Sequence, residues 1–419
     1  MKVWHISRDD NTGGASKAAY RLHVAMNQAD IDSHLRVLNR ETANDKVISG
    51  RPSRSFATKV RTRIEKILRE QKQRRFKTDN LIMHSFGQES AGIVNELNQC
   101  GADILNLHWI AKLLSIDDIG RLIKPLVWTF HDMWAFCGGE HVVSDDAQAR
   151  FRLGYLANNR PAGESGPDLN RSAWEAKRNA WAERNITVVT PGRWMAQCAR
   201  ESILFKDRPI HVIPNPLDMQ QLWRPIPKQF ARRALGLPLN KKLVLAGSAG
   251  GMPHLKGEDL LEEAMVIAST SMTNDLELVI FGQYRPSNHA KWPYPVHWLG
   301  PVRDDHVLAT LYSAADLMVV PSRQDNLPNT AVEAQACGTP VVAFNIGGLP
   351  DIVTHQESGW LAEAFDTNAL AAGISWVLAD ENRLPQLSVR ARDNALNKYS
   401  ESVVTAQYLA VYETVMSRA

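Results

Sequence analysis

At 419 residues, 44% of them apolar, the chain is long enough to fill the cores of two domains of ordinary size. It has no run of roughly 18 apolar residues, and its amino-terminal stretch enters a strand at once, so neither a membrane span nor a secretory leader is expected. The net charge is only +3, and the four cysteines are scattered without a C-x-x-C pair, which argues against disulfides and structural zinc and favours a cytoplasmic enzyme.

The first predicted strand, residues 3–6, is followed by a loop with Gly13 and Gly14 and then by a helix over residues 16–28. A glycine pair between a first strand and a first helix lets the backbone approach a ligand closely and aims helix N–H groups at it, as a diphosphate site requires. The loop matches neither the G-x-G-x-x-G fingerprint nor a Walker loop. A plain tight turn explains the two glycines equally well.

Positive charge is concentrated in residues 51–77, which begin with Arg51 and end with Lys77 and contain eleven Lys or Arg against two Glu. A basic amphipathic helix here fits an anionic membrane surface, and so a peripheral position on the inner membrane. A solvated helix whose apolar stripe packs on its own domain fits the pattern equally. No recognised nucleic-acid-binding fold accompanies the basic residues, so nucleic acid is not an expected partner. The stripe consists of Phe56, Val60, Ile64, Ile67 and Leu68.

Two further strands are predicted over residues 102–108 and 126–130. The first ends at His108, and the second is followed directly by His131. The imidazole of His131 is expected at the carboxyl edge of the sheet, where it can hydrogen-bond a sugar hydroxyl or orient an acceptor. Neighbouring Asp132 can set the tautomer of that imidazole or bind substrate itself. The strand-end position favours a functional role for His131, whereas a structural role is favoured for His108.

The domain organisation is predicted from a proline-rich run that ends at Pro238 and separates two α/β series. We expect an amino-terminal domain over residues 1–218 and a carboxy-terminal domain over residues 219–399. The apolar pattern of residues 400–419 predicts a closing helix. This helix packs either back on the first domain or on its own.

The second α/β series begins with a strand over residues 242–247, and the loop after it contains Ser248 and leads to Lys256 and Gly257. A lysine beside a glycine-bearing loop at a helix entrance is a suitable counter-charge for a diphosphate leaving group. Lysines are also common on protein surfaces, so the loop alone does not decide the role of Lys256.

The segment 321–350 is the most informative part of the chain, because carboxylates follow the end of a predicted parallel strand, where open α/β sheets bind ligands. Asp325 and Glu333, eight positions apart, are expected to accept hydrogen bonds from sugar and ribose hydroxyls. Helix N–H groups near Asn329 and Thr330 are expected to meet the diphosphate. Thr330 and Glu333 also match a capping box, in which Glu333 only closes the helix start.

Taken in order, these motifs resemble the retaining glycosyltransferases of family 4, and within them the enzymes of bacterial polysaccharide synthesis. The resemblance covers nearly the whole chain and is most specific from residue 311 to residue 348. It rests on Gly13-Gly14-Ala15, Thr129-Phe130-His131-Asp132, Val212-Ile213-Pro214-Asn215, Lys256-Gly257, residues 311–316, Pro321-Ser322, Asp325 with Glu333-Ala334, and residues 337–342.

The resemblance implies an α/β fold of the GT-B type, in which two Rossmann-like domains face a central cleft and a closing helix crosses back to the first domain. It also implies that Glu333 binds the donor ribose, Asp325 binds the sugar and Lys256 binds the diphosphate. In the first domain, the resemblance implies that Gly14 belongs to the cleft loop and that His131 contacts the transferred sugar or the acceptor. Members of the family transfer with retention and need no bound metal. The D-x-D at residues 30–32, which precedes a strand, is accordingly interpreted as a polar turn.

Three departures from the family pattern stand out. The first carboxylate is usually Glu, whereas Asp325 is one methylene shorter. No arginine stands between Gly247 and Lys256, where Ser248 occurs instead, so Arg303 or Arg323 is a candidate substitute. Residues 137–141 lack the cysteine-rich continuation of some relatives.

The expected reaction moves a hexose-type sugar from a nucleotide-sugar donor to a saccharide or lipid-linked saccharide, without a cofactor or metal. His131, Asp325 and Lys256 are the predicted catalytic residues, and the catalysis is expected to be mainly electrostatic. A nucleotide-sugar 2-epimerase and a non-catalytic sugar-nucleotide-binding subunit remain open alternatives. A dehydrogenase is disfavoured because neither βα turn carries the dinucleotide fingerprint.

Overall fold

The computed structural model describes residues 1–52, 56–247, 253–270, 272, 275–285 and 292–418. The chain forms two compact units, one made of Met1–Ile213 with Gln407–Ala419 and the other of Pro214–Ala406. The division therefore falls a few residues before the predicted boundary at residue 218.

The first unit is built on a parallel sheet with the strand order β3-β2-β1-β4-β5-β6-β7. Because the order runs outward in both directions from β1 and β4, the sheet is doubly wound in the Rossmann manner. Its strands are β1 (Lys2–Ile6), β2 (Asp32–Arg36), β3 (Val47–Ile48), β4 (Ile104–Leu107), β5 (Leu126–Thr129), β6 (Ile186–Thr190) and β7 (Ile210–Val212).

A side-chain cap sets the start of one helix of the first unit. This helix, α6, begins at Leu169, because the Asp168 carboxylate accepts a hydrogen bond from the Arg171 N–H and satisfies a helix-start donor. The helices are α1 (Gly14–Gln28), α2 (Phe56–Arg75), α3 (Val94–Gln99), α4 (Ile116–Gly120), α5 (Arg150–Leu153), α6 (Leu169–Trp181) and α7 (Arg193–Glu201), with a 3-10 turn at Ala157–Asn159.

The second unit repeats the same plan, with the parallel order β10-β9-β8-β11-β12-β13. Side chains alternate between two cores: Leu243 and Leu245 of β8 enter one, and Val244 and Ala246 enter the other. Because both faces are covered by helices, the strands are mostly apolar rather than strictly alternating. The strands are β8 (Lys242–Gly247), β9 (Leu276–Phe281), β10 (Val296–Gly300), β11 (Leu317–Val320), β12 (Val341–Phe344) and β13 (Gly359–Ala362).

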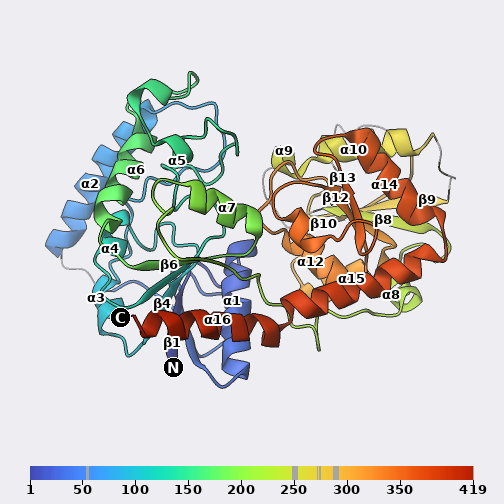
Figure 1. Cartoon of the computed structure of the whole chain (residues 1–419), viewed down its shortest axis with the longest axis horizontal. Coiled ribbons are helices and arrows are strands. Elements are labelled where there is room, and N and C mark those ends of the chain that lie inside the picture. Colours follow the sequence, from blue (N-terminus) through green and yellow to red (C-terminus); the bar gives the residue numbers. More distant parts are fainter. Residues whose placement is uncertain (53–55, 248–252, 271, 273–274, 286–291, 419) are drawn as a thin grey trace. The chain divides into compact units, whose positions relative to one another are not determined.

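The helices of the second unit are α8 (Lys228–Leu235), α9 (Pro253–Lys256), α10 (Glu258–Ala268), α11 (Asp305–Ala314), α12 (Asn329–Ala336), α13 (Leu349–Ile352), α14 (Thr367–Ala379), α15 (Arg383–Tyr399) and the first turns of α16 (Glu401–Met416) (Figure 1). The prediction of an α/β chain with two Rossmann-like domains is confirmed. Among the helices described, none has both the length and the apolar composition that crossing a membrane requires.

The closing helix α16 starts in the second unit and ends in the first. In the first unit its Tyr412 hydroxyl accepts a hydrogen bond from the Asn106 amide of β4 at 2.8 Å, and its Tyr408 hydroxyl lies 3.2 Å from the hydroxyl of Thr129 in β5. All four side chains are buried, so these polar contacts fix the helix against the sheet.

Candidate functional site

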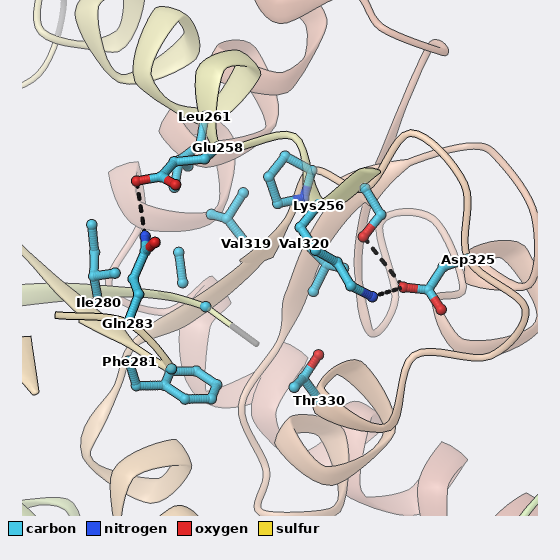
Figure 2. A pocket seen from close by; sticks show the side chains of 15 residues that line it. Lys256, Glu258, Leu261, Ile280, Phe281, Gln283, Val319, Val320, Asp325 and Thr330 are labelled. Carbon is cyan, nitrogen blue, oxygen red and sulfur yellow. Dashed lines mark hydrogen bonds and ion pairs between the residues drawn. The ribbon is translucent and has the colours of Figure 1, made fainter. Parts of the chain in front are cut away.

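A cavity of about 150 Å³ opens at the carboxyl ends of β8, β9 and β11 in the second unit (Figure 2). β8 and β11 are adjacent, but the strand order runs away from them in opposite directions, so the loops that follow them diverge. Ligands of open α/β sheets bind at such a point. Of the predicted site residues, Lys256, Asp325 and Thr330 line this cavity.

Lys256 and Asp325 form an ion pair in the cavity (Figure 2). Lys256 is the last residue of α9, and its Nζ lies 2.7 Å from Oδ2 of Asp325 in the loop after β11. The Ser322 hydroxyl donates to the same oxygen at 3.4 Å. The two charged side chains were expected to serve the diphosphate and the sugar separately, whereas here each one neutralises the other.

Glycines hold the Asp325 loop in place. Gly347 has a φ of +53°, and a Cβ there would lie 2.2 Å from the carbonyl oxygen of Asp325. At Gly348 a Cβ would lie 1.6 Å from the carbonyl oxygen of Asn326, and the Gly348 N–H donates to the Asp325 carbonyl at 3.0 Å. The backbone of this glycine pair thus lies close against the loop that carries Asp325.

Glu333 is buried in α12 and is not among the residues that line the cavity. Its Oε2 accepts a hydrogen bond from the Tyr312 hydroxyl at 3.1 Å. The alternative interpretation of Thr330 and Glu333 as a capping box is wrong, because Pro328 occupies the N-cap position and no side chain caps the helix. The buried carboxylate is held from the side by α11 instead.

The remaining predicted donor contacts in the second unit have mixed outcomes. Ser248 lies outside the described residues. Asn329, the first residue of α12, accepts a hydrogen bond from the Asn215 amide at 3.4 Å.

Arg323, a candidate replacement for the missing loop arginine, forms a two-pronged ion pair with Asp259, with N–O distances of 2.6 and 2.7 Å. This bonding raises the pKa of Arg323. Any diphosphate contact by Arg323 would therefore compete with Asp259.

Sequence reasoning missed the polar pair on the opposite wall of the cavity. The Gln283 amide donates to Oε1 of Glu258 at 2.8 Å, and both residues line the cavity next to Phe281 (Figure 2). The sequence did not mark Glu258 as a site residue, because an acidic residue in the first turn of a helix ordinarily interacts favourably with the helix dipole.

In the first unit, Gly13 precedes α1 with a φ of +84°, a conformation that favours glycine, and the space where its Cβ would point is open. Gly14 is the first residue of the helix. The backbone at this helix start is therefore exposed to approach, as a ligand-binding loop requires.

Asp132 is held by three donors. Its Oδ2 lies 3.0 Å from Nε1 of Trp109 and 2.7 Å from Nδ1 of His141, and its Oδ1 accepts from the Trp134 N–H at 2.9 Å. His141 also bonds the Ser85 hydroxyl, at 2.8 Å. Burial raises the pKa of Asp132, but the interactions with His141, the Trp134 N–H and His131 together outweigh it and leave the pKa below its usual range. These contacts make Asp132 a structural anchor of the loop after β5.

His131 bonds the neighbouring His108 through its Nε2, at 3.0 Å from Nδ1 of that ring. Asp132 had been expected to set the tautomer of His131, but the group found on Nε2 is this second imidazole. Burial lowers the pKa of His131 to about 4, although the charge of Asp132 acts in the opposite direction. His131 is therefore neutral at pH 7.

Comparison with known families gives matches to both halves of the chain. The family described as Glycosyltransferase Family 4 matches residues 12–221, and the family described as Glycosyl transferases group 1 matches residues 241–380. The chain belongs to glycosyltransferase family 4.

Proteins with the name D-inositol 3-phosphate glycosyltransferase are among its relatives. The protein from Xylanimonas cellulosilytica is 33% identical over 224 residues, which are 50% of this chain and 52% of the relative. The protein from Catenulispora acidiphila is 31% identical over 289 residues, which are 64% and 66% of the two chains. The chain thus spans about half the length of the first of these curated relatives.

Solved structures place this family 4 member among GT-B proteins. Sucrose-phosphate synthase from Thermosynechococcus elongatus superposes with a TM-score of 0.66 at 17% identity and covers both chains completely. Anabaena Alr3699/HepE, in complex with UDP and glucose, gives a TM-score of 0.65 at 15% identity and covers 99% of this chain and 100% of its own. At these identities the likeness establishes the fold alone, and it confirms the GT-B class.

Proposed function

We propose that the protein is a retaining, metal-independent glycosyltransferase of cell-surface polysaccharide synthesis. It transfers a hexose-type sugar from a nucleotide-sugar donor to a saccharide or lipid-linked saccharide acceptor. No cofactor takes part, because the nucleotide sugar is itself a substrate.

The observation that carries this proposal is the cavity at the strand-order reversal of the second unit, with Lys256, Asp325 and the start of α12 at its wall. A lysine and helix N–H groups provide positive charge for a diphosphate, and a carboxylate accepts hydrogen bonds from sugar hydroxyls.

In the proposed reaction the bond between the sugar C1 and the β-phosphate oxygen breaks, and the negative charge develops on the departing diphosphate. Lys256 leaves Asp325 and stabilises that charge, together with N–H groups at the start of α12. The acceptor hydroxyl attacks C1 from the same face, and its proton passes to the departing phosphate oxygen. His131 contacts the transferred sugar or the acceptor.

Relatives supply the first donors and acceptors to test. Anabaena Alr3699/HepE has been crystallised with UDP-glucose, and WaaG is described as a glycosyltransferase involved in lipopolysaccharide biosynthesis. UDP-sugars therefore come first in a donor screen, with lipid-linked saccharides and inositol phosphate as acceptors.

Release of the nucleoside diphosphate from each donor, with and without acceptor, tests the proposal. Lys256→Ala is expected to lower kcat/KM by at least ~100-fold, because it removes charge stabilisation that is needed mainly in the transition state. The matched control is Lys241→Ala, since Lys241 is also ion-paired, with Asp275 at 3.0 Å, but at the amino end of β8. Equal activity of the two variants would refute the role of Lys256.

The same assay separates the alternative reactions. A change of the sugar in the donor alone would indicate an epimerase. Donor binding without turnover across all acceptors would indicate a non-catalytic subunit.

A further inference from the structure

Three histidines of the first unit form a chain of hydrogen bonds across neighbouring strands. Nδ1 of His5 lies 3.0 Å from Nε2 of His108, and Nδ1 of His108 lies 3.0 Å from Nε2 of His131. His5 is on β1, His108 follows β4 and His131 follows β5, and β4 lies between the other two strands. The rings are joined in series, so they do not converge on one point as metal ligands would.

The inner end of this chain is a methionine. Nε2 of His5 lies 3.3 Å from Sδ of Met26 in α1, and both side chains are completely buried. A thioether sulfur has no hydrogen and can only accept. The proton of His5 must therefore sit on Nε2, which leaves Nδ1 of His5 as an acceptor.

That assignment fixes the direction of every later bond. A neutral imidazole has one N–H, so Nε2 of His108 donates to His5 and Nδ1 of His108 accepts. Nε2 of His131 then donates to His108. Burial lowers the pKa of all three rings, which keeps each of them neutral, with a single N–H.

We propose that Met26, acting through His5 and His108, holds His131 in the Nε2–H tautomer, so that His131 offers Nδ1 only as a hydrogen-bond acceptor. Met26, His5 and His108 are positioning residues in this scheme. Nδ1 can accept from an O–H group but repels oxygens that carry no hydrogen. Within the proposed function, on which this role in catalysis rests, His131 therefore engages a hydroxyl of the sugar or acceptor and not a diphosphate oxygen.

The tautomers can be read directly by long-range ¹⁵N–¹H correlation spectra of the whole chain labelled with ¹⁵N-histidine, with signals assigned by His5→Asn, His108→Asn and His131→Asn. The wild type is expected to show all three rings as Nε2–H. Met26→Leu keeps the apolar volume but removes the acceptor, so His131 should gain a population of the Nδ1–H form. Met195→Leu, which changes another buried methionine of the first unit, should leave the spectrum unchanged.

An Nδ1–H or doubly protonated His131 in the wild type would overturn the inference, as would a Met26→Leu spectrum identical to that of Met195→Leu. In a glycosyltransferase assay, Met26→Leu should lower kcat/KM by at least ~5-fold relative to Met195→Leu, the effect of one misdirected hydrogen bond. The spectra do not depend on turnover. A wild-type chain with the expected tautomers but no transfer would disprove the proposed function and leave the tautomer assignment standing.

Discussion

At the scale of single residues, the Lys256–Asp325 pair changes how the cavity of the second unit is understood. The two side chains are 35% and 15% exposed, and ion pairs of this kind contribute at most about 1 kcal/mol to stability. Breaking the pair therefore costs a ligand little. In the proposed reaction, Asp325 holds Lys256 in the cavity until a diphosphate takes its place, and Asp325 is then left to accept hydrogen bonds from the sugar.

Tyr312 is a residue whose importance only the structure reveals. Tyr312→Phe removes the hydroxyl that donates to the buried Glu333, and losing a hydrogen bond to a buried carboxylate costs about 1.5–3 kcal/mol. Urea denaturation of the purified chain should show this loss. Tyr284→Phe, at a tyrosine that is 76% exposed in the same unit, should change the free energy of unfolding by less than about 0.5 kcal/mol. Equal stability of the two variants would contradict the assigned role.

At the scale of elements, α2 presents apolar side chains to solvent among its basic residues. Ile67 is 49% exposed and Leu68 is 55% exposed, so at these two positions the stripe is not covered by the unit itself. The side chains of Phe56, Val60 and Ile64 lie outside the described part of the chain. The exposed pair supports the membrane interpretation of the basic helix over the packed alternative.

Vesicle binding tests this interpretation. Replacing Ile67 and Leu68 with Ser should weaken sedimentation with vesicles that contain phosphatidylglycerol by at least ~10-fold, because each buried aliphatic side chain contributes about 1.5–3 kcal/mol. Val389→Ser, at a residue of α15 that is 60% exposed, is the control. Binding should also fall as salt screens the basic residues. Unchanged binding of the double variant would rule out this helix as the membrane contact.

At the scale of the whole molecule, the two units should respond differently to pH. Burial lowers the pKa of His23 and His131 to about 4 and that of His5 and His108 as well, all in the first unit. The unfolded chain then binds more protons than the folded one, and stability is lost as pH falls from about 6.5 towards 4. In the second unit, burial and Asp218 raise the pKa of Glu401 to about 7, so stability there is lost as pH rises from about 4.5 to 7.

Lowering the pH from 7 to 5.5 should therefore reduce the free energy of unfolding of the first unit by about 1 kcal/mol for each such histidine. The protonation of Glu401 should stabilise the second unit over the same pH range. Hydrogen exchange read on peptides of each unit, corrected for the intrinsic effect of pH, measures both changes. A uniform response of the two units would show that the buried histidines are not held neutral.

The positions of residues relative to strand ends explain how much of the candidate site could be predicted from the sequence. Lys256, Asp325 and Thr330 were found from the sequence because each follows a buried strand or opens a helix, and such positions collect at one edge of a parallel sheet. The capping alternative at Glu333 was wrong. The partner of that carboxylate depends on which neighbouring group supplies the hydrogen bond, and local patterns do not contain that information.

The sequence by itself determined the two α/β series, the family and three of the residues at the cavity, Lys256, Asp325 and Thr330. These features follow from the spacing of hydrophobic residues, the positions of turn residues and the order of the motifs, which can all be read along the chain. Only the tertiary structure decided that Lys256 meets Asp325, that Tyr312 holds Glu333, and that His5 and Met26 lie behind His131. Such pairs join residues that are far apart in the chain, and strand order and helix packing alone bring their atoms within bonding distance.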